Sequence, residues 1–200
     1  MKKYIAEMFG TFTLSFLVFL SVSGKFPIPT PVLASLCLTM FVYTIGSISG
    51  AHLNPAVTIG LLFIKKIKFS EAVKYIIFQI IGAYLAIYIL SQLSVNIVAP
   101  VLAGGSREFF AEMLGMVVFT FGISSVVYGN APGVIVGGSL LLGISISALV
   151  GSAGILNPAV ALVLQAFYPT YIFGEIFGSL IGFSFYQWLN KSSLRKIRKD

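Results

Sequence analysis

The chain has 200 residues, of which 58% are hydrophobic and 10% are charged, whereas soluble domains carry about 25% charged residues. So few charged side chains cannot cover a water-soluble surface, which excludes an extracellular enzyme, a soluble binding module and a disordered tail. The net charge of +7 does not indicate a nucleic-acid partner, because the Lys and Arg residues lie near the ends of apolar runs.

Continuous apolar runs of roughly 18–22 residues predict helices that cross a hydrocarbon core of about 30 Å. A transmembrane barrel would need alternating apolar and polar residues, and an open sheet cannot satisfy its backbone groups in lipid. The expected fold is therefore an all-α membrane protein. We predict six membrane spans, over about residues 4–23, 31–49, 71–93, 109–128, 134–150 and 171–189.

The first apolar run has an alternative interpretation as a cleaved signal peptide. It follows Lys2 and Lys3 and ends near the small residues 21–24, as such peptides do. Its length of roughly 20 residues and the carboxyl group of Glu7 favour a membrane span instead.

The distribution of positive charge predicts the orientation. Six spans place both termini on one side of the membrane. If that side is cytoplasmic, eleven of the thirteen Lys and Arg residues lie inside, and only Lys25 and Arg107 lie outside. The positive-inside rule therefore predicts cytoplasmic termini.

Two sequence motifs recur at nearly the same offset. The segment Ala6–Gly10 (Ala-Glu-Met-Phe-Gly) reappears as Ala111–Gly115 (Ala-Glu-Met-Leu-Gly), and the Asn-Pro-Ala-Val of residues 54–57 reappears at 157–160. The chain is therefore predicted to be a duplication, and because each unit has three spans, the second is inverted relative to the first. The predicted units are a first repeat over 1–93, a connecting loop over 94–106, a second repeat over 107–190 and a charged cytoplasmic tail over 191–200.

Each repeat contains an apolar piece that is too short to cross the bilayer. These pieces, residues 54–63 and 157–167, would each reach about halfway, roughly 15 Å at 1.5 Å per residue. Asn is a favoured N-cap and Pro is favoured at the first helical position, so each piece is predicted to be a half-helix that begins at Asn-Pro. Entering from opposite faces, the two would meet N-terminus to N-terminus near the midplane.

Facing half-helices would have a chemical consequence beyond capping. Each N-terminus carries about half a positive charge, which repels cations and hydronium but not neutral molecules. The carboxamides of Asn54 and Asn157 would offer N–H donors to a passing oxygen and so interrupt a proton wire. A capped helix with no further role is the plainer interpretation of either motif.

The segment Ser49–Thr58, Ser-Gly-Ala-His-Leu-Asn-Pro-Ala-Val-Thr, resembles the first signature loop of the aquaporin (major intrinsic protein) family. The resemblance extends to the repeated Glu, the loop lengths and the second Asn-Pro-Ala. It implies a right-handed bundle of six membrane helices with two re-entrant half-helices, one pore per chain, no cofactor and a homotetramer. The pore motifs would be Asn54, Pro55, Ala56, Asn157, Pro158 and Ala159.

The same resemblance assigns roles to three further polar residues. Glu7 and Glu112 match the buried glutamates that brace the re-entrant loops by accepting backbone hydrogen bonds. His52 matches a histidine beside the first half-helix, where we favour a structural hydrogen bond over direct contact with solute.

The predicted selectivity filter departs from the pattern of the family. Most members have Arg directly after the second Asn-Pro-Ala, but this chain has Val160, as some plant tonoplast members do. The acidic residue typical of glycerol facilitators is replaced by Ala161. By spacing from the two Asn residues, the filter positions are Ala34, Ser145, Gly154 and Val160. All four are small or apolar, which predicts a wider and less polar constriction than in a strict water channel.

Two features of the last span remain. Glu175 lies where an apolar residue or Pro is expected, and a pore-facing site, a subunit interface and an edge position reaching the headgroups all remain open for it. Gly174, Gly178 and Gly182 form a small face suited to close helix packing.

The leading functional hypothesis is a passive channel for water and small uncharged solutes such as glycerol, urea, ammonia or hydrogen peroxide, in a plasma membrane. An ion-leak or weak-acid pathway, opened by the missing Arg, and a non-conducting structural member of the fold are the alternatives. An enzyme is not expected, because the sequence has no HExxH motif and no nucleophile–base set. The single Cys37 offers no cysteine metal site.

Overall fold

The computed structural model describes residues 1–24, 27–93 and 104–191. Lys25, most of the predicted connecting loop and all but the first residue of the predicted tail lie outside the described residues. Within the described ranges the secondary structure is entirely helical. The helices are α1 (Lys2–Val22), α2 (Thr30–Ser49), α3 (Pro55–Phe63), α4 (Phe69–Gln92), α5 (Ser106–Val127), α6 (Val134–Val150), α7 (Pro158–Val163) and α8 (Pro169–Leu189).

The six long helices correspond to the six predicted spans. Four of them, α1, α2, α4 and α5, are long and apolar enough to cross a membrane by length and composition. Helix α6 is equally apolar but has 17 residues, and α8 has 21 residues but contains Glu175 and Gln187. Large apolar side chains are exposed on these helices, for example Phe9, Leu36 and Phe177. Such a surface suits lipid, and the chain is a multi-pass membrane protein.

The second half-helix is shorter than expected. Helix α7 has six residues and ends at Val163, whereas the sequence predicted a helix to residue 167. Gln165 adopts a left-handed conformation (φ 56°), and the N–H of Ala166 bonds to the carbonyl of Ala161 at 2.8 Å, which closes the helix. Helix α3 ends in the same way at Lys65 (φ 61°), but three residues later relative to its Asn-Pro start.

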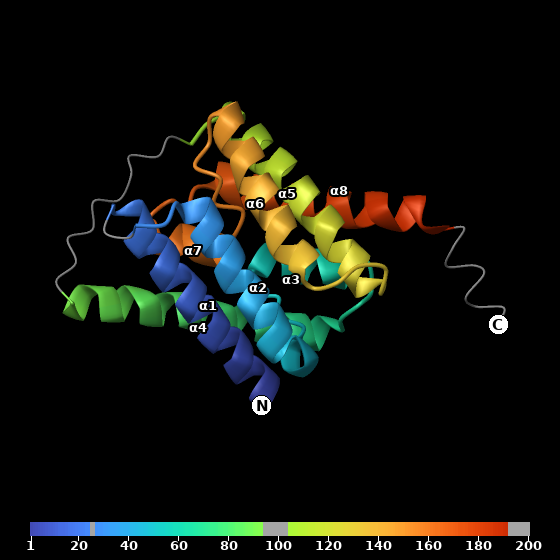
Figure 1. The fold of residues 1–200 in the computed structure, drawn as a ribbon, viewed down its shortest axis with the longest axis horizontal. Helices are drawn as coiled ribbons and strands as arrows, with labels where there is room; N and C mark the ends of the chain where they lie inside the picture. Colours follow the sequence, from blue (N-terminus) through green and yellow to red (C-terminus); the bar gives the residue numbers. More distant parts are fainter. Residues whose placement is uncertain (25–26, 94–103, 192–200) are drawn as a thin grey trace.

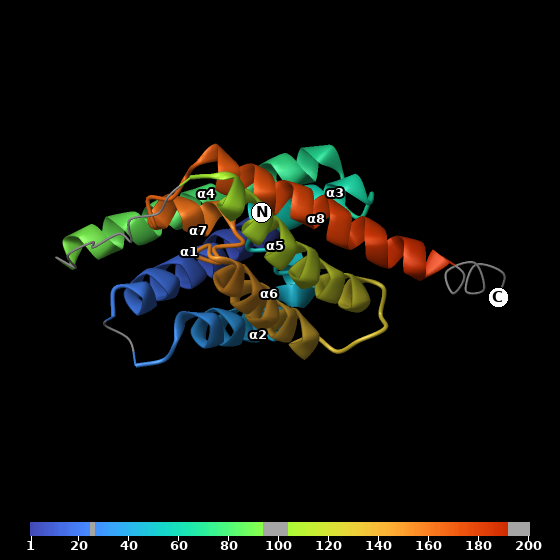
Figure 2. The same ribbon diagram turned by 90° about the horizontal axis from the view of Figure 1, so that it is seen from above.

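The helices form two sets with the same internal contacts. Helix α1 packs against α2 and α4, and α5 packs against α6 and α8, while α2 and α6 join the two sets. Each half-helix crosses to the other set, because α3 packs mainly on α8 and α7 packs mainly on α4 and α1. Figures 1 and 2 show this exchange, with α7 beside α1 and α4, and α3 beside α8. The exchange brings the starts of α3 and α7 together inside the bundle.

Close packing of α8 on α5 depends on its glycine face. A Cβ atom at Gly174, Gly178 or Gly182 would lie 2.4–2.6 Å from a backbone carbonyl oxygen of α5. No larger side chain fits at these three positions without separating α5 and α8, so the glycines allow the two helices to pack closely.

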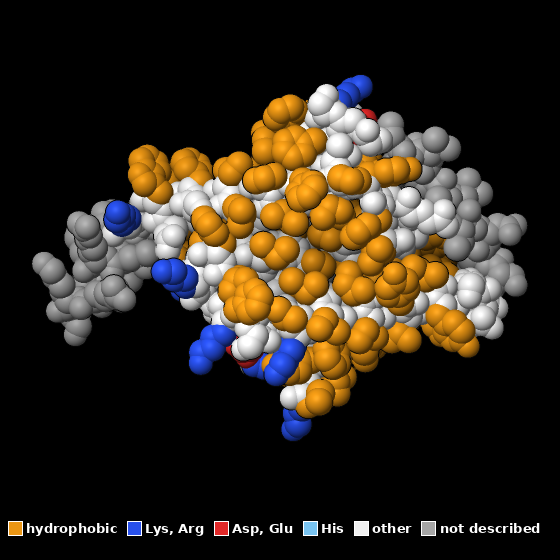
Figure 3. All heavy atoms as spheres, turned by 180° about the vertical axis from the view of Figure 1, so that it is seen from behind, with side chains coloured by type: hydrophobic (Ala, Val, Ile, Leu, Met, Phe, Trp, Pro, Cys, Tyr) orange, Lys and Arg blue, Asp and Glu red, His pale blue; other side chains and the backbone are white. Residues whose placement is uncertain are grey.

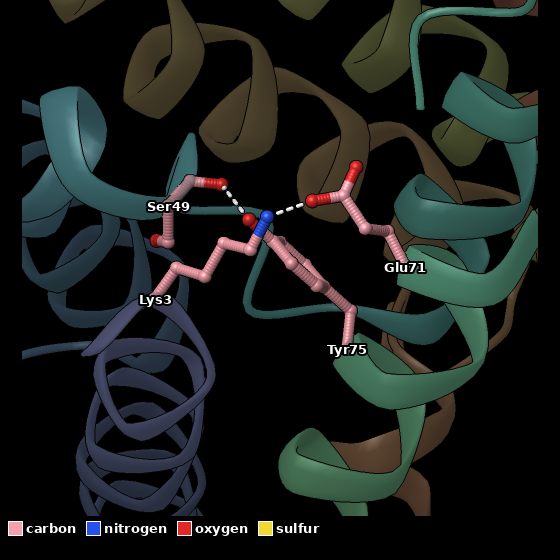
Figure 4. A network of polar contacts seen from close by, with 4 residues as sticks. All are labelled: Lys3, Ser49, Glu71 and Tyr75. Atoms are coloured by element: carbon pink, nitrogen blue, oxygen red, sulfur yellow. Dashed lines mark hydrogen bonds and ion pairs between the residues drawn. The ribbon is translucent and has the colours of Figure 1, made fainter. Parts of the chain in front are cut away.

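Charged side chains gather at the edges of the molecule. In Figure 3, hydrophobic side chains cover a broad belt, and Lys and Arg side chains lie mainly along one border of it. Figure 4 shows a polar cluster where α1, α2 and α4 meet. Lys3 forms an ion pair with Glu71, and the Tyr75 hydroxyl donates to the carbonyl of Ser49 at 2.7 Å. The Tyr75 bond anchors the end of α2 directly before the first Asn-Pro-Ala loop.

Candidate pore

Helices α3 and α7 begin in the same way. Asn54 and Asn157 precede them in an extended conformation, and each is followed by Pro at the first helical position. The Oδ1 atom of Asn54 accepts the N–H groups of Ala56 (2.9 Å) and Val57 (3.3 Å). The Oδ1 atom of Asn157 accepts the N–H of Ala159 at 3.0 Å. Both residues are therefore side-chain N-caps.

The same two asparagines link the half-helices to each other. The Nδ2 atom of Asn54 donates to the carbonyl of Leu156 at 2.7 Å, and the Nδ2 atom of Asn157 donates to the carbonyl of Leu53 at 3.0 Å. All four residues are at least 96% buried. The two helix starts therefore face each other in the interior, and each carboxamide uses one N–H bond in this contact.

The residues before the caps have an unfavourable backbone. Leu53 (φ 49°) and Leu156 (φ 52°) are both left-handed, which costs roughly 1–2 kcal/mol for a residue with a Cβ atom. Their N–H groups point at buried carboxylates. Glu7 Oε2 accepts the N–H of Leu53 at 2.7 Å, and Glu112 Oε2 accepts that of Leu156 at 2.9 Å. These charge-assisted bonds offset the backbone cost.

Glycine completes each brace. A Cβ atom at Gly10 would lie 2.4 Å from a methyl group of Leu53, and one at Gly115 would lie 2.9 Å from a methyl group of Leu156. The repeated Ala-Glu-Met-x-Gly motif thus supplies an acceptor for the loop and the space for its leucine. The repeat is visible in the sequence, but the role of its glycine appears only in the structure, where Leu53 and Leu156 pack against it.

Each buried carboxylate has further donors. Glu7 also accepts the Ser49 hydroxyl (2.7 Å), the N–H of His52 (2.9 Å) and Nε2 of Gln79 (2.8 Å). The role of Gln79 could not be predicted from the sequence, because a single Gln in an apolar helix does not indicate which residue it will contact.

In the second repeat, Glu112 accepts four more bonds at Oε1. The donors are the hydroxyls of Ser147 (3.1 Å) and Ser152 and the N–H groups of Gly154 (2.9 Å) and Ile155 (3.2 Å).

His52 lies beside the first half-helix and faces the cavities described next. Its Nδ1 atom is 3.1 Å from the Thr58 hydroxyl, and its ring packs on Tyr75 with centroids 4.8 Å apart. His52 therefore contacts Thr58 and Tyr75 and also lines both cavities.

Two cavities meet at the helix starts. One of about 330 Å³ is bordered by Asn54 and Asn157, and the other, of about 240 Å³, extends along α3 toward Lys66. Both are lined by Leu38, His52 and Phe119, so they adjoin. We refer to these two adjoining cavities, the larger of which is bordered by the paired asparagines, as the path.

Three of the four predicted filter residues line the larger cavity. These are Ala34, Gly154 and Val160. Ser145 does not line it, and its hydroxyl donates to the carbonyl of Leu141 at 2.7 Å. Ile144, one residue earlier, lines the cavity instead.

The difference arises because one residue turns a side chain by about 100° around a helix. Counting back from Asn157 fixes a position in the sequence but not the face of α6. Gly154 (φ 66°) fits against Ile144, since a Cβ atom there would lie 2.8 Å from its carbonyl oxygen.

The path is nearly free of charge. Among the described residues, Lys66 is the one Lys, Arg, Asp or Glu that lines either cavity, and its Nζ atom lies 4.1 Å from the ring centroid of Tyr128. Arg107 does not replace the missing filter Arg, because its Nε atom donates to the carbonyl of Val150 at 2.8 Å, at the end of α6.

Glu175 is an interior residue. It is fully buried, and its Oε1 atom accepts the backbone N–H of Asn157 at 2.9 Å. This contact places Glu175 beside the second cap and away from lipid, which settles the position that the sequence left open.

The comparisons agree with this architecture. A family model described as Major intrinsic protein matches residues 1–186. The chain is 36% identical over 178 residues to glycerol uptake facilitator protein-like 6 of Lactiplantibacillus plantarum, covering 80% of this chain and 81% of that protein. It is 28% identical over 240 residues to the aquaporin AqpM of Methanothermobacter marburgensis, covering 94% and 97%.

A solved structure has the same fold. The X-ray structure of the aquaglyceroporin from Plasmodium falciparum matches with a TM-score of 0.65 and 20% sequence identity, over 100% of this chain and 99% of that one. The family match spans nearly the whole chain, and a relative above 30% identity covers four fifths of it. The chain therefore belongs to the major intrinsic protein family.

Proposed function

We propose that the chain is a passive channel for water and small uncharged solutes. The observation that carries this function is a pair of adjoining cavities, the larger of which is bordered by the linked caps of α3 and α7. Two adjoining cavities with a mostly apolar lining, in which the caps supply amide groups and Lys66 is the one charged side chain among the described residues, favour passage of neutral molecules over binding of one ligand.

Selection against cations is assigned to the two facing half-helices. Each N-terminus contributes about half a positive charge at the same point in a low-dielectric interior. The second hydrogen on Nδ2 of each Asn carboxamide donates to the oxygen of a passing molecule and orients it. Val160 adds no charge to this barrier, so exclusion rests on Asn54, Asn157 and the helix ends behind them.

Solutes larger than water are included because the lining of the larger cavity is small and apolar at the predicted filter. Ala34, Ile144, Gly154 and Val160 present no charged group to this cavity of about 330 Å³. The similarity to a glycerol uptake facilitator-like protein supports glycerol as one of these solutes.

The test is solute-resolved flux in proteoliposomes. Light scattering would follow osmotic shrinkage and reswelling with water, glycerol and urea, and an internal pH dye would follow protons. We expect water and solute flux above the lipid background and proton flux at background. The blocked variant is Ala34→Trp, whose side chain would fill the cavity, and the matched control is Leu36→Trp, on the exposed face of the same helix.

Each alternative has its own outcome in this assay. Proton or cation flux above background would replace the proposal with a leak pathway, while background flux of every solute through folded protein would indicate a non-conducting member of the fold. Equal flux through Ala34→Trp and Leu36→Trp would show that the cavity is not the route.

We further propose that the protein is a homotetramer in the plasma membrane with both termini cytoplasmic. The excess of Lys and Arg in the segments assigned to the inside supports the orientation, and the family resemblance supports the tetramer. Labelling a Lys191→Cys variant with an impermeant thiol reagent tests the orientation, because intact cells should protect it. Chemical cross-linking in membranes should give a ladder that ends at four copies.

A further inference from the structure

The carboxyl group of Glu175 is the least expected polar group in the bundle. The side chain is fully buried, and only Oε1 has a partner, the backbone N–H of Asn157 at 2.9 Å. The Oε2 atom has no hydrogen-bond partner among the described residues. A buried ionised carboxylate with one bare oxygen would be costly in any protein interior, and more so inside a membrane.

The other half of the molecule has a carboxamide at the equivalent place. Gly82 in α4 and Gly178 in α8 each lie against the carbonyl of the methionine in the Ala-Glu-Met-x-Gly motif, with a hypothetical Cβ at 2.3 and 2.4 Å. Three residues before these glycines lie Gln79 and Glu175. The internal repeat therefore pairs a neutral Gln in one half with Glu in the other.

Gln79 acts as a neutral donor next to a buried carboxylate. Its Nε2 atom donates to Oε2 of Glu7 at 2.8 Å and to the Thr58 hydroxyl at 3.1 Å. A Glu side chain at the same position can supply a donor only when it carries a proton, because an ionised carboxylate accepts and does not donate.

The hydrogen-bond partners decide which carboxyl of the second half holds a proton. Glu112 lies close to Glu175, because its Cβ atom would be 3.3 Å from a Cβ atom at Gly174, the residue directly before Glu175, where α5 and α8 pack together. Five donors point at Glu112, whereas one points at Glu175. Two neighbouring buried carboxyls do not both ionise readily, so the negative charge resides on Glu112 and the proton on Glu175.

We propose that Glu175 is a positioning residue held as a neutral carboxylic acid, at the position in the second half that the neutral Gln79 occupies in the first. Its Oε1 atom fixes the backbone of Asn157 at the start of α7, and its Oε2 atom carries the proton. This role rests on the proposed channel function, since the residue that Glu175 positions is one of the two pore asparagines.

The protonation state matters for selectivity. A negative charge on Glu175 would sit at the N–H of Asn157 and offset the positive end of α7, which is half of the proposed barrier to cations. The titratable group facing Glu175 from α5 is Glu112, with Glu108 one turn away, and Tyr171 is on its own helix. Helices α3 and α7, which also pack on α8, carry no titratable side chain.

The direct test is infrared spectroscopy of the full-length protein in liposomes. We expect the wild type to show a protonated-carboxyl C=O stretch at neutral pH. That band should disappear in Glu175→Gln and remain in Glu71→Gln, a matched control whose carboxyl lies at the surface in an ion pair with Lys3. An identical band in wild type and Glu175→Gln, or no band in the wild type, would overturn the proposal.

Flux measurements test the positioning role. Glu175→Gln keeps an acceptor for Asn157 N–H and needs no proton, so its water flux should match that of the wild type. Glu175→Ala lacks the acceptor, and its water flux per folded protein should fall several-fold. A fall in Glu175→Gln as large as in Glu175→Ala would contradict a neutral positioning role.

The pH profile separates this role from simple packing. Cation leak through the wild type should rise as the pH is made alkaline, because Glu175 then ionises, while Glu175→Gln should show no such rise. A rise of equal size in both would overturn the assignment of the proton to Glu175. Background flux through the wild type and every variant would refute the proposed channel function but not the protonation of Glu175, because the infrared result does not depend on transport.

Discussion

The cross-link between the two Asn-Pro-Ala loops can be separated from helix capping by substituting Asn54. In Asn54→Ser, the hydroxyl still caps α3, because Ser is as good an N-cap as Asn, but it cannot reach the carbonyl of Leu156. Asn54→Ala loses both functions. Comparing the two variants therefore separates the effect of capping from that of one hydrogen bond, from Asn54 Nδ2 to the carbonyl of Leu156 at 2.7 Å, which joins residues 102 positions apart in the chain.

The magnitudes follow from the bonds that are lost. Removing the donor to a buried carbonyl costs about 1–3 kcal/mol, which we expect for Asn54→Ser. Losing the cap adds about 1 kcal/mol, so Asn54→Ala should cost about 2–4 kcal/mol. Asn157→Ala loses one capping hydrogen bond where Asn54→Ala loses two, so it should lower the free energy of unfolding slightly less.

The assay is equilibrium unfolding in mixed micelles with increasing denaturing detergent, together with osmotic water permeability per protein. Stability should fall in the order wild type, Asn54→Ser, Asn54→Ala, and permeability should fall in the same order because both caps border the pore. If Asn54→Ser were as stable as the wild type, the cross-link would not hold the half-helices together. If the Ser and Ala variants were equal, the Ser hydroxyl would not be capping.

Three further predictions concern single positions. Val160→Arg should lower glycerol flux more than water flux in the shrinkage assay, because the side chain narrows the cavity that Val160 lines; an equal reduction would contradict a wide filter. Gly115→Ala places a Cβ atom 2.5 Å from a backbone carbonyl oxygen of α6 and should lower the free energy of unfolding by about 1–3 kcal/mol. The control Gly138→Ala, whose Cβ atom would have nothing within 4 Å, should leave stability unchanged or raise it, and the reverse order would contradict this packing. Lys66 is the one charged side chain among the described residues that line the path, so it should add a second, weaker barrier to cations besides the helix starts. Lys66→Gln should therefore raise cation leak without changing water flux, whereas Lys65→Gln, at an exposed neighbour that lines neither cavity, should change neither; equal leak through the two variants would refute this second barrier.

Local signals were enough to predict the helices and their starts. In lipid a helix satisfies its own backbone groups, so an apolar run of sufficient length predicts a span whatever its neighbours are. Asn54-Pro55 and Asn157-Pro158 are likewise local signals, because the cap and the fixed φ of Pro act within one turn. The end of α7 was not readable, since Gln165 has no intrinsic preference for the left-handed conformation that ends the helix.

Only the tertiary structure decided which groups meet. The bonds from Glu7 to the first loop span more than 40 residues, and those between the two asparagine caps and the opposite loops span more than 100. The replacement of Ser145 by Ile144 in the cavity lining depends on how α6 is rotated, and the position of Glu175 depends on α8 packing beside the start of α7. Periodicity states which residues share a helix face, but the partner of that face is set by packing among six helices whose surfaces are apolar on nearly every side. The duplicated motifs therefore predicted two half-helices that meet start to start, while the packing of each half-helix on the long helices of the opposite half came from the folded chain alone.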